Sequence, residues 1–366
     1  MKRRIAGIVE TILNEKPGYQ EISVRPEANG ASAPTVITAH NLMALTGRVS
    51  VGDSVLLHIA SSEGDAYVAA GRGETTEEPS GERITKLRST PLELPVAAAE
   101  LPDSPHHAAL RLFASLDDLP VVCMELHMQL PAVCAAAHWS LSFHAWPRPP
   151  RIAYIMTDSG GLALSLSPLI APLKTEGLLT ATITAGQAFG GDYESVNLYS
   201  ALALAREVVE ADIVVVSQGP GNVATGTPLG FTGIDQGVAV NATASLGGVA
   251  IVVPRLNFEE THTRHRGLSH HTVTVLLRVA RANTLIPVPR LPDRQSRLMH
   301  AALETTGIAA AHEVITLEAE LGLSALTSRP NLVALQAQAL EADQPLFLSA
   351  AAAGMLAAQL VEVRKP

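Results

Sequence analysis

Residues 182–237, TITAGQAFGGDYESVNLYSALALAREVVEADIVVVSQGPGNVATGTPLGFTGIDQG, decide the fold. Two strand-like pieces, residues 181–185 and 212–217, each end in a polar, glycine-rich loop. The second carries the run IVVV, which is typical of a strand buried on both faces and therefore of a parallel sheet. Between them, Asp192 is expected to cap a helix extending to Glu210, because apolar residues recur there at helical spacing. The stretch therefore predicts a right-handed strand-helix-strand unit with parallel strands.

The same alternation continues on either side of this unit. Strand-like runs begin at Pro120, Arg151 and Val249, and a helical pattern follows each of them. A last strand is expected at residues 284–288. Strict alternation at these lengths predicts an α/β fold with a doubly wound, mainly parallel sheet. Because such sheets bind ligands beyond the carboxyl ends of their strands, a functional site is expected at that edge.

Three segments differ in pattern and are predicted to be separate parts. Residues 1–93 hold five short strand candidates between turn signals, which predicts a small β-barrel of OB-like or SH3-like type. Residues 94–290 form the parallel-sheet α/β domain. Residues 291–366 are expected to form a helix-rich extension packed on that domain, with a strand at HEVITL and an alanine-rich last helix suited to close packing.

Composition limits the classes of function. Of 366 residues, 47% are hydrophobic and 4% aromatic, and the formal net charge is -9. An acidic chain repels polyanions and this barrel lacks aromatic platforms, so nucleic-acid binding is not favoured. Cys123 and Cys134 are expected to be free, buried thiols, which favours a reducing compartment such as the cytoplasm. The start is not a signal peptide, and the apolar run 346–358 is shorter than the roughly 20 residues of a membrane span, so no membrane partner is expected; homo-oligomerisation stays open.

Polar residues collect where the predicted strands end. The candidates for acid-base or metal-ligand chemistry are His127, Asp158, Glu194 and His270. The candidates for substrate binding are Gln187, Gln218, Gly219, Gly221, Thr225, Thr227, Arg264 and Arg266. Because the carboxyl ends of parallel strands meet at one edge, we expect these residues to share a pocket. Hydrolysis or group transfer is the chemistry that these residue types favour.

The glycine loop at residues 218–230, QGPGNVATGTPLG, has two interpretations. Backbone N–H groups and threonine hydroxyls beside a helix start suit a phosphate or carboxylate. The loop lacks the lysine of a Walker motif and matches the dinucleotide-binding glycine pattern only in part. Alternatively, its glycines form a tight turn that lets the next helix approach the sheet.

A basic loop at residues 255–271 contributes three arginines and four histidines. Arginine forks suit planar anions, and histidines act as acid, base or ligand near neutral pH. A divalent metal cofactor stays open, with candidate ligands His127, Asp158, Asp192, Glu194, His265, His270 and His271. The adjacent His270 and His271 are expected to point about 100° apart on a helix and not to share one ion. Ser269 is interpreted as the N-cap of that helix rather than as a nucleophile.

Five long motifs resemble one protein family over almost the whole chain. They are ELHMQLPAV, AYIMTDSGGLALSLS, TAGQAFGGDYESVNLYSAL, GPGNVATGTPLGFTGIDQG and RHRGLSHHT. Together with the connector KLRSTPLEL they are similar to an uncharacterised bacterial family, the domain of unknown function 3866. This resemblance implies membership, and it carries no activity, ligand or catalytic role over to these residues.

Three functions follow as hypotheses. The leading one is a cytoplasmic enzyme that binds a small anionic, phosphorylated or nucleotide-like substrate at the carboxyl edge of the sheet. The second is a metabolite sensor or scaffold in which the same pocket binds without turnover. The third is a nucleic-acid-binding barrel joined to an inert α/β domain.

Overall fold

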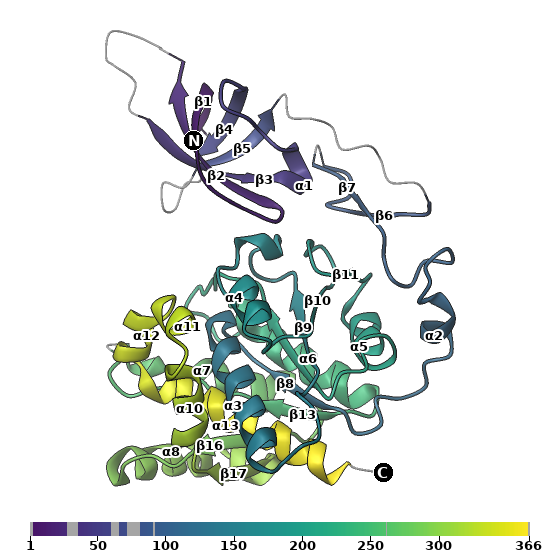
Figure 1. The fold of residues 1–366 in the computed structure, drawn as a ribbon. Helices are drawn as coiled ribbons and strands as arrows, with labels where there is room; N and C mark the ends of the chain where they lie inside the picture. Colours follow the sequence, from purple (N-terminus) through teal and green to yellow (C-terminus); the bar gives the residue numbers. More distant parts are fainter. Residues whose placement is uncertain are drawn as a thin grey trace. The chain divides into compact units, whose positions relative to one another are not determined.

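The chain contains two compact units, Met1–Ala97 and Ala98–Pro366 (Figure 1). The computed structural model describes residues 3–27, 36–59, 66–71, 81–90, 92–260 and 262–364.

The first unit contains a closed barrel with the strand order β1-β2-β3-β5-β4. Its elements are β1 (Arg3–Lys16), β2 (Tyr19–Pro26), β3 (Ile37–Leu42), α1 (Met43–Thr46), β4 (Ser54–Ile59) and β5 (Ala66–Gly71), and β6 (Ile84–Lys86) pairs with β7 (Leu94–Val96) outside the barrel. Ile22, Val24 and Leu57 are among the side chains that fill its interior. β3 and β5 pair in parallel, whereas β1 pairs antiparallel with both β2 and β4, which is the Greek-key connectivity of an OB-type barrel. The predicted small barrel is confirmed.

The second unit is built around eight parallel strands in the order β11-β10-β9-β12-β8-β13-β16-β17. These are β8 (Pro120–Cys123), β9 (Ile152–Thr157), β10 (Ala181–Thr184), β11 (Tyr193–Glu194), β12 (Ile213–Gln218), β13 (Val249–Val252), β16 (Leu285–Pro289) and β17 (Glu313–Leu317). Every residue of β8, β9, β10 and β12 is buried, as strands covered on both faces require. The chain moves outward to one side through β10 and β11 and to the other through β13, β16 and β17. The predicted parallel sheet is confirmed, and its direction of winding reverses around β12 and β8.

Helices cover both faces of this sheet (Figure 1). On one face, α5 (Leu198–Glu207) contacts β9 and β10, and α6 (Asp235–Ser245) contacts β12, β8 and β13. On the other, α13 (Gln344–Val363) contacts β8, β13 and β16 and packs against α3 (Leu130–Phe143). Shorter helices α2 (His107–Arg111) and α4 (Ile170–Thr175) lie in the connections. The doubly wound α/β prediction is therefore confirmed.

The helix predicted from Asp192 begins later than expected. Residues Tyr193–Glu194 form β11, and α5 starts after Asn197, whose side chain accepts a hydrogen bond from the Ser200 N–H at 3.1 Å. Asp192 instead accepts bonds from the Thr182 N–H at 2.7 Å and from Lys174 Nζ at 2.5 Å. These bonds fix Asp192 beside β10, so it cannot cap the helix.

The C-terminal part extends the sheet and then covers it. Its elements before α13 are α8 (Asp293–Thr306), α9 (Ile308–Ala311), β17, α10 (Glu320–Thr327), α11 (Pro330–Ala334) and α12 (Ala337–Ala342). The alanine-rich α13 approaches α3 closely at Gly354, where an added Cβ would lie 2.2 Å from the carbonyl oxygen of Val133. Small residues therefore allow α13 to pack within the chain.

Helix α13 alone, among the described residues, has the length and apolar composition of a membrane span. It is 20 residues long with a mean hydropathy of 1.7, so the expectation that the apolar run is too short was wrong. Of its most apolar window, 78% is buried inside the protein. Packing against α3 and the sheet accounts for its composition.

Candidate functional site

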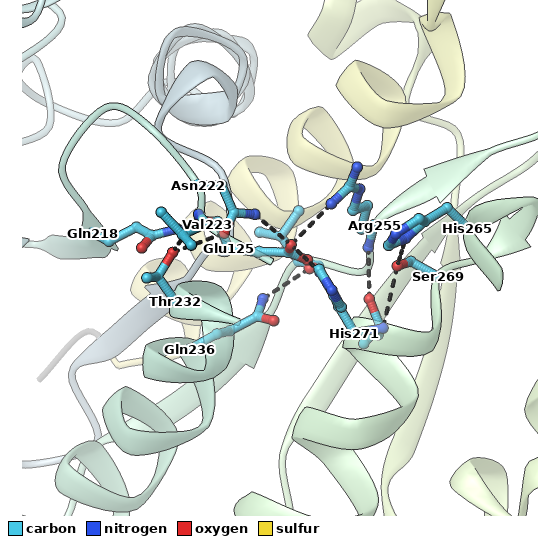
Figure 2. Close-up of polar contacts among 12 residues, drawn as sticks. Glu125, Gln218, Asn222, Val223, Thr232, Gln236, Arg255, His265, Ser269 and His271 are labelled. Atoms are coloured by element: carbon cyan, nitrogen blue, oxygen red, sulfur yellow. Dashed lines mark hydrogen bonds and ion pairs between the residues drawn. The ribbon is translucent and has the colours of Figure 1, made fainter. Parts of the chain in front are cut away.

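Loops that follow neighbouring strands meet at the carboxyl edge of the sheet (Figure 2). Glu125 follows β8, Asn222 lies in the loop after β12, and Arg255 follows β13. The loop after β13 continues through β14 (Leu256–Asn257), a 3-10 turn (Thr263–His265) and β15 (Gly267–Leu268) into α7 (His270–Thr274) and a π-helix (Val275–Val279). Because β12, β8 and β13 are adjacent where the winding reverses, this edge is where such sheets bind ligands.

Glu125 is the buried centre of this site, and its side chain is 1% exposed. Its Oε1 accepts hydrogen bonds from Asn222 Nδ2 at 3.0 Å, Arg255 Nη1 at 3.0 Å and His271 Nδ1 at 2.6 Å (Figure 2). Burial acts to raise the pKa of Glu125, but the His271 hydrogen bond and the Arg255 charge outweigh it and hold the pKa below its usual value. Glu125 is therefore an ionised carboxylate, and His271 Nδ1 is the donor. Glycine at position 233 makes room, since a Cβ there would lie 2.4 Å from Glu125 Cγ.

Ser269 and His265 form the next layer around His271. Ser269 caps α7 as predicted, its Oγ accepting from the His271 N–H at 3.2 Å. The same Oγ is 2.8 Å from His265 Nδ1. Burial lowers the pKa of His265 to about 4, and the Arg255 charge adds to this effect. His265 is therefore neutral at pH 7.

His270 completes a cluster of three imidazoles. Its ring centroid lies 4.8 Å from that of His265 and 4.4 Å from that of His271. One ring nitrogen from each of the three lies within 4.8 Å of the others, so the expectation that His270 and His271 diverge too far to share an ion was wrong. Helical geometry separates their Cβ directions by about 100°, but side-chain torsions in the first turn of α7 bring the rings back together. Burial lowers the pKa of His270, and its buried Nε2 has no hydrogen-bond partner in the described part of the chain.

An apolar cavity of about 370 Å³ lies between the residues that follow Glu125 and the glycine loop. It is lined by His127, Gln218, Gly219, Gly221 and Asn222 and by residues near α11 and α12, including Gln336. Asn222 links the cavity to the imidazole cluster because it also donates to Glu125. The buried amide oxygens of Gln218 and Gln336 are left without partners among the described residues, although the amide nitrogens donate to Glu125 O and Met128 O.

The glycine loop is braced by its own hydrogen bonds. Thr225 N donates to Gly230 O at 2.8 Å, and the Thr225 and Thr227 hydroxyls lie 3.0 Å apart. Gly219 allows close packing, since an added Cβ would lie 2.1 Å from Gly161 O. Gly221 has a φ of 92°, which favours glycine. These contacts support the tight-turn interpretation for the two glycines, and anion binding by the loop stays a prediction.

The two predicted arginines lie against different residues. A Cβ on Gly226 would lie 2.8 Å from Arg264 Nη1, so Arg264 sits against the glycine loop, and its charge also reaches His270. Arg266 Nε instead donates to Glu260 O at 2.9 Å and lines a separate cavity of about 720 Å³ near α8. Of these two predicted arginines, Arg264 is therefore the one that joins the glycine loop to the imidazole cluster.

Three of the predicted acid-base residues are held by neighbouring loops and strands. Both ring nitrogens of His127 are engaged, by Tyr154 OH at 2.8 Å and Ser167 Oγ at 2.7 Å. Asp158 Oδ2 accepts from the Gln187 N–H at 2.8 Å. The two Glu194 oxygens accept from Thr184 Oγ1 and the Gly190 N–H, both at 2.7 Å. Asp158, Gln187 and Glu194 thus brace the ends of β9, β10 and β11, and His270 is the predicted acid-base residue within the cluster.

The sequence prediction did not select Glu125, Asn222 or Arg255 as site residues, and it named His265 and His271 only as candidate metal ligands. A signal was present, because Glu125 is the first charged residue after the buried run PVVCM and Arg255 is the first after VAIVVP. His271 immediately follows His270 in the first turn after the serine cap. The bond between Glu125 and His271 joins residues 146 positions apart, which no local pattern encodes.

Comparison with known proteins gives one family and no closer relative. Neither a curated protein nor a solved structure matches the chain. A family model described as "Protein of unknown function (DUF3866)" matches residues 38–354, a range that includes every residue of the site described above. The chain therefore belongs to the DUF3866 family.

Proposed function

We propose that this chain is an enzyme that binds a small anionic, phosphorylated or carboxylated, substrate at the carboxyl edge of its sheet and catalyses hydrolysis or group transfer. One observation carries the proposal. The charge of Arg264 acts on His265 and His270, and the adjacent His271 is oriented by the buried carboxylate of Glu125. A cation for the substrate and an oriented base therefore occupy the same edge.

Arg264 supplies the anion-binding element. It is exposed, and no hydrogen bond or ion pair to its guanidinium occurs within the described ranges. A guanidinium fork binds a phosphate or carboxylate through two parallel bonds. Arg255 lies nearby but is partly neutralised by Glu125. Arg264 is thus the cation available to a ligand.

The imidazoles supply the proton acceptor. Glu125 accepts from Nδ1 of His271, which leaves Nε2 of that ring as the nitrogen that can accept a proton. Low pKa values keep His265 neutral at pH 7, and the pKa of His270 is lowered as well. A neutral imidazole accepts a proton from water or a hydroxyl group as bond formation proceeds. The proposed chemistry does not use His127, Asp158 or Glu194.

The apolar cavity next to Asn222 would hold the non-reacting part of the substrate. Gln218 and Gln336 line it, and their buried amide oxygens have no hydrogen-bond partner among the described residues. A buried acceptor without a partner costs roughly 1–3 kcal/mol, which a ligand donor would recover. A substrate with an apolar body and N–H or O–H donors is therefore favoured over a bare inorganic anion.

The proposal is tested by anion binding and turnover with the full chain. Inorganic phosphate and pyrophosphate are titrated by calorimetry, and hydrolysis is assayed on a panel of phosphate esters, anhydrides and carboxylate esters. Arg264→Ala should weaken anion binding at least tenfold, since charged hydrogen bonds contribute about 1.5–3 kcal/mol. Arg278→Ala, which removes an exposed arginine from the π-helix, is the matched control and should bind normally. Equal loss in both variants would refute the site, and binding without any turnover would favour the sensor hypothesis.

We place the protein in a bacterial cytoplasm. Cys123 and Cys134 are both free and buried, as the sequence predicts, and burial raises the pKa of each thiol to about 12. Unpaired thiols of this kind suit a reducing compartment. A small anionic ligand is the only partner that the proposed function requires.

A further inference from the structure

We propose that His265, His270 and His271 together bind one divalent metal ion of the zinc type. The ion would lie at the edge to which the proposed function assigns the substrate. The inference rests on that function for the role of the ion and not for its binding, which the imidazole geometry supports by itself.

The spacing of the ring nitrogens suits a single ion. One nitrogen from each histidine lies within 4.8 Å of the other two. Zinc-nitrogen bonds of about 2.0–2.1 Å in a tetrahedron place ligand nitrogens roughly 3.4 Å apart. The widest pair therefore closes by at most about 1.4 Å, which small side-chain rotations achieve. Three protein ligands leave a fourth position for water or substrate, as in catalytic zinc sites.

In two of the three histidines, the ring nitrogen that would face away from the ion already has a hydrogen-bond partner, as in metal-binding histidines. Glu125 Oε1 accepts from His271 Nδ1 at 2.6 Å, and Ser269 Oγ lies 2.8 Å from His265 Nδ1 (Figure 2). The Nε2 atoms of these two rings therefore remain for an ion. A carboxylate behind a ligating imidazole fixes its tautomer and raises its basicity. Glu125 thus has the position of an outer-shell partner.

A cluster of imidazoles without an ion leaves polar atoms unsatisfied. No hydrogen bond joins the three rings to one another in the described part of the chain. Among the described residues, His270 Nε2 is buried without a partner, and each such atom carries a desolvation cost. Stacking explains the position of one ring, since Phe231 lies parallel to His271 at 3.8 Å between centroids. It does not explain why the other two rings turn toward it, and a shared ion does.

The charges around the cluster indicate which ion and which fourth ligand fit. Three neutral nitrogen donors favour zinc-like ions over magnesium or calcium, which prefer oxygen. Arg255 and Arg264 repel a cation, whereas Glu125 attracts it. The balance favours an anion at the fourth position, either hydroxide or the substrate itself. When bound, such an ion would polarise the substrate and lower the pKa of its water. Because the ion would occupy the imidazole lone pairs, this water would take over from the imidazoles as the proton acceptor of the proposed function.

Metal binding is measured on the full chain with Zn²⁺ and Co²⁺ alone. The protein is stripped with a chelator, titrated by calorimetry, and followed by cobalt absorption and by the rise in melting temperature that a bound ion produces. One ion per chain is expected. His270→Ala should weaken binding at least ~100-fold, exceeding the about 10–100-fold loss typical of outer-shell substitutions and expected for Glu125→Gln. His262→Ala removes an exposed histidine of the same loop and should bind as the unchanged protein does.

The outcomes separate this inference from the proposed function. No uptake of either ion by the stripped chain, or equal losses in the His262 and His270 variants, would overturn the metal site. Melting curves of the metal-free variants check that the His270 variant is folded. Arg264→Ala should lose phosphate affinity while still taking up one Zn²⁺. Metal uptake with no anion binding would therefore reject the proposed function and leave the metal site standing.

Discussion

Glu125 Oε1 lies 2.6 Å from His271 Nδ1, and the two side chains are 1% and 2% exposed. This contact joins the end of β8 to the first turn of α7 across 146 residues of sequence. The same Glu125 oxygen also accepts hydrogen bonds from Arg255 and Asn222. The position of one buried carboxylate therefore determines the tautomer of the imidazole and the seating of two loops.

Replacing this carboxylate should cost stability as well as ligand binding. Glu125→Gln removes the negative charge beneath Arg255, and we expect a loss of about 2–3 kcal/mol, below the roughly 3–5 kcal/mol of a fully buried broken pair because Arg255 is partly exposed. The free energy of unfolding in denaturant measures it. Glu304→Gln, at an exposed position on α8, should change stability by less than about 0.5 kcal/mol. Similar values for the two variants would contradict the buried-pair account.

Acid should destabilise the protein through His127. Burial lowers the pKa of this imidazole from 6.5 to about 4, so its contribution is complete above pH 6.5 and is lost as the pH falls toward 4. His127→Gln lacks this group. The stability difference between the original protein and the variant should shrink by about 3 kcal/mol between pH 7 and pH 4. Parallel pH profiles would show that the imidazole does not titrate as its burial implies.

The Asp343 carboxyl should have the opposite effect on stability, which should fall as the pH rises. Burial raises its pKa from 3.8 to about 6, although Asn257 Nδ2 donates to its Oδ2 at 2.8 Å. Stability from the protonated carboxyl is complete below pH 4 and is lost as the pH rises through 6. Asp343→Asn should therefore gain about 1 kcal/mol over the original protein between pH 4 and pH 7, after discounting for solvent screening. Unfolding curves at both pH values test it, and a gain of equal size at pH 4 would argue against titration.

The contact between α3 and α13 should not tolerate a methyl group at Gly354. An added Cβ would lie 2.2 Å from the rigid carbonyl oxygen of Val133. We expect Gly354→Ala to destabilise by about 2–3 kcal/mol despite the better helix propensity of alanine. Gly322→Ala is the comparison, because its nearest contacts are the flexible Met355 Sδ at 2.9 Å and Ala136 Cβ at 3.0 Å, which are side-chain atoms and less close than the Val133 carbonyl is to Gly354. It should cost less than about 1 kcal/mol, and a larger loss there than at Gly354 would invert the explanation.

Buried apolar runs made the parallel sheet predictable. Side-chain hydrogen bonds and strand pairing set the bounds of β11 and α5, and these bounds were not predictable. The run IVVV lies in β12, every residue of which is buried. β11 is two residues long, too short for any periodic pattern, and its place depends on pairing with β10. Asp192 looks like a helix cap in sequence, but Thr182 and Lys174 hold it elsewhere. The local helix propensity of a sequence carries no information about such hydrogen-bond partners.

The meeting of polar loops at the carboxyl edge was predictable, and most of the side-chain contacts between those loops were not. Polar residues after each strand do lie at the carboxyl edge, because parallel strands end together. Which of them faces a ligand depends on small differences along the chain. Glu125 meets His271, whereas His127, two residues later, is enclosed by Tyr154 and Ser167. A position after a strand end does not by itself predict which partners a side chain will contact.

Helix α13 has a consequence for how the protein is made. It contacts β8, β13 and β16 and also α3, yet it comes from residues 344–363, after every strand that it covers. During translation, the face of the sheet that α13 covers therefore stays exposed until this helix emerges from the ribosome. The second unit is therefore expected to complete its folding only after α13 has been synthesised. Ribosome-bound chains stalled before residue 344 should depend on chaperones.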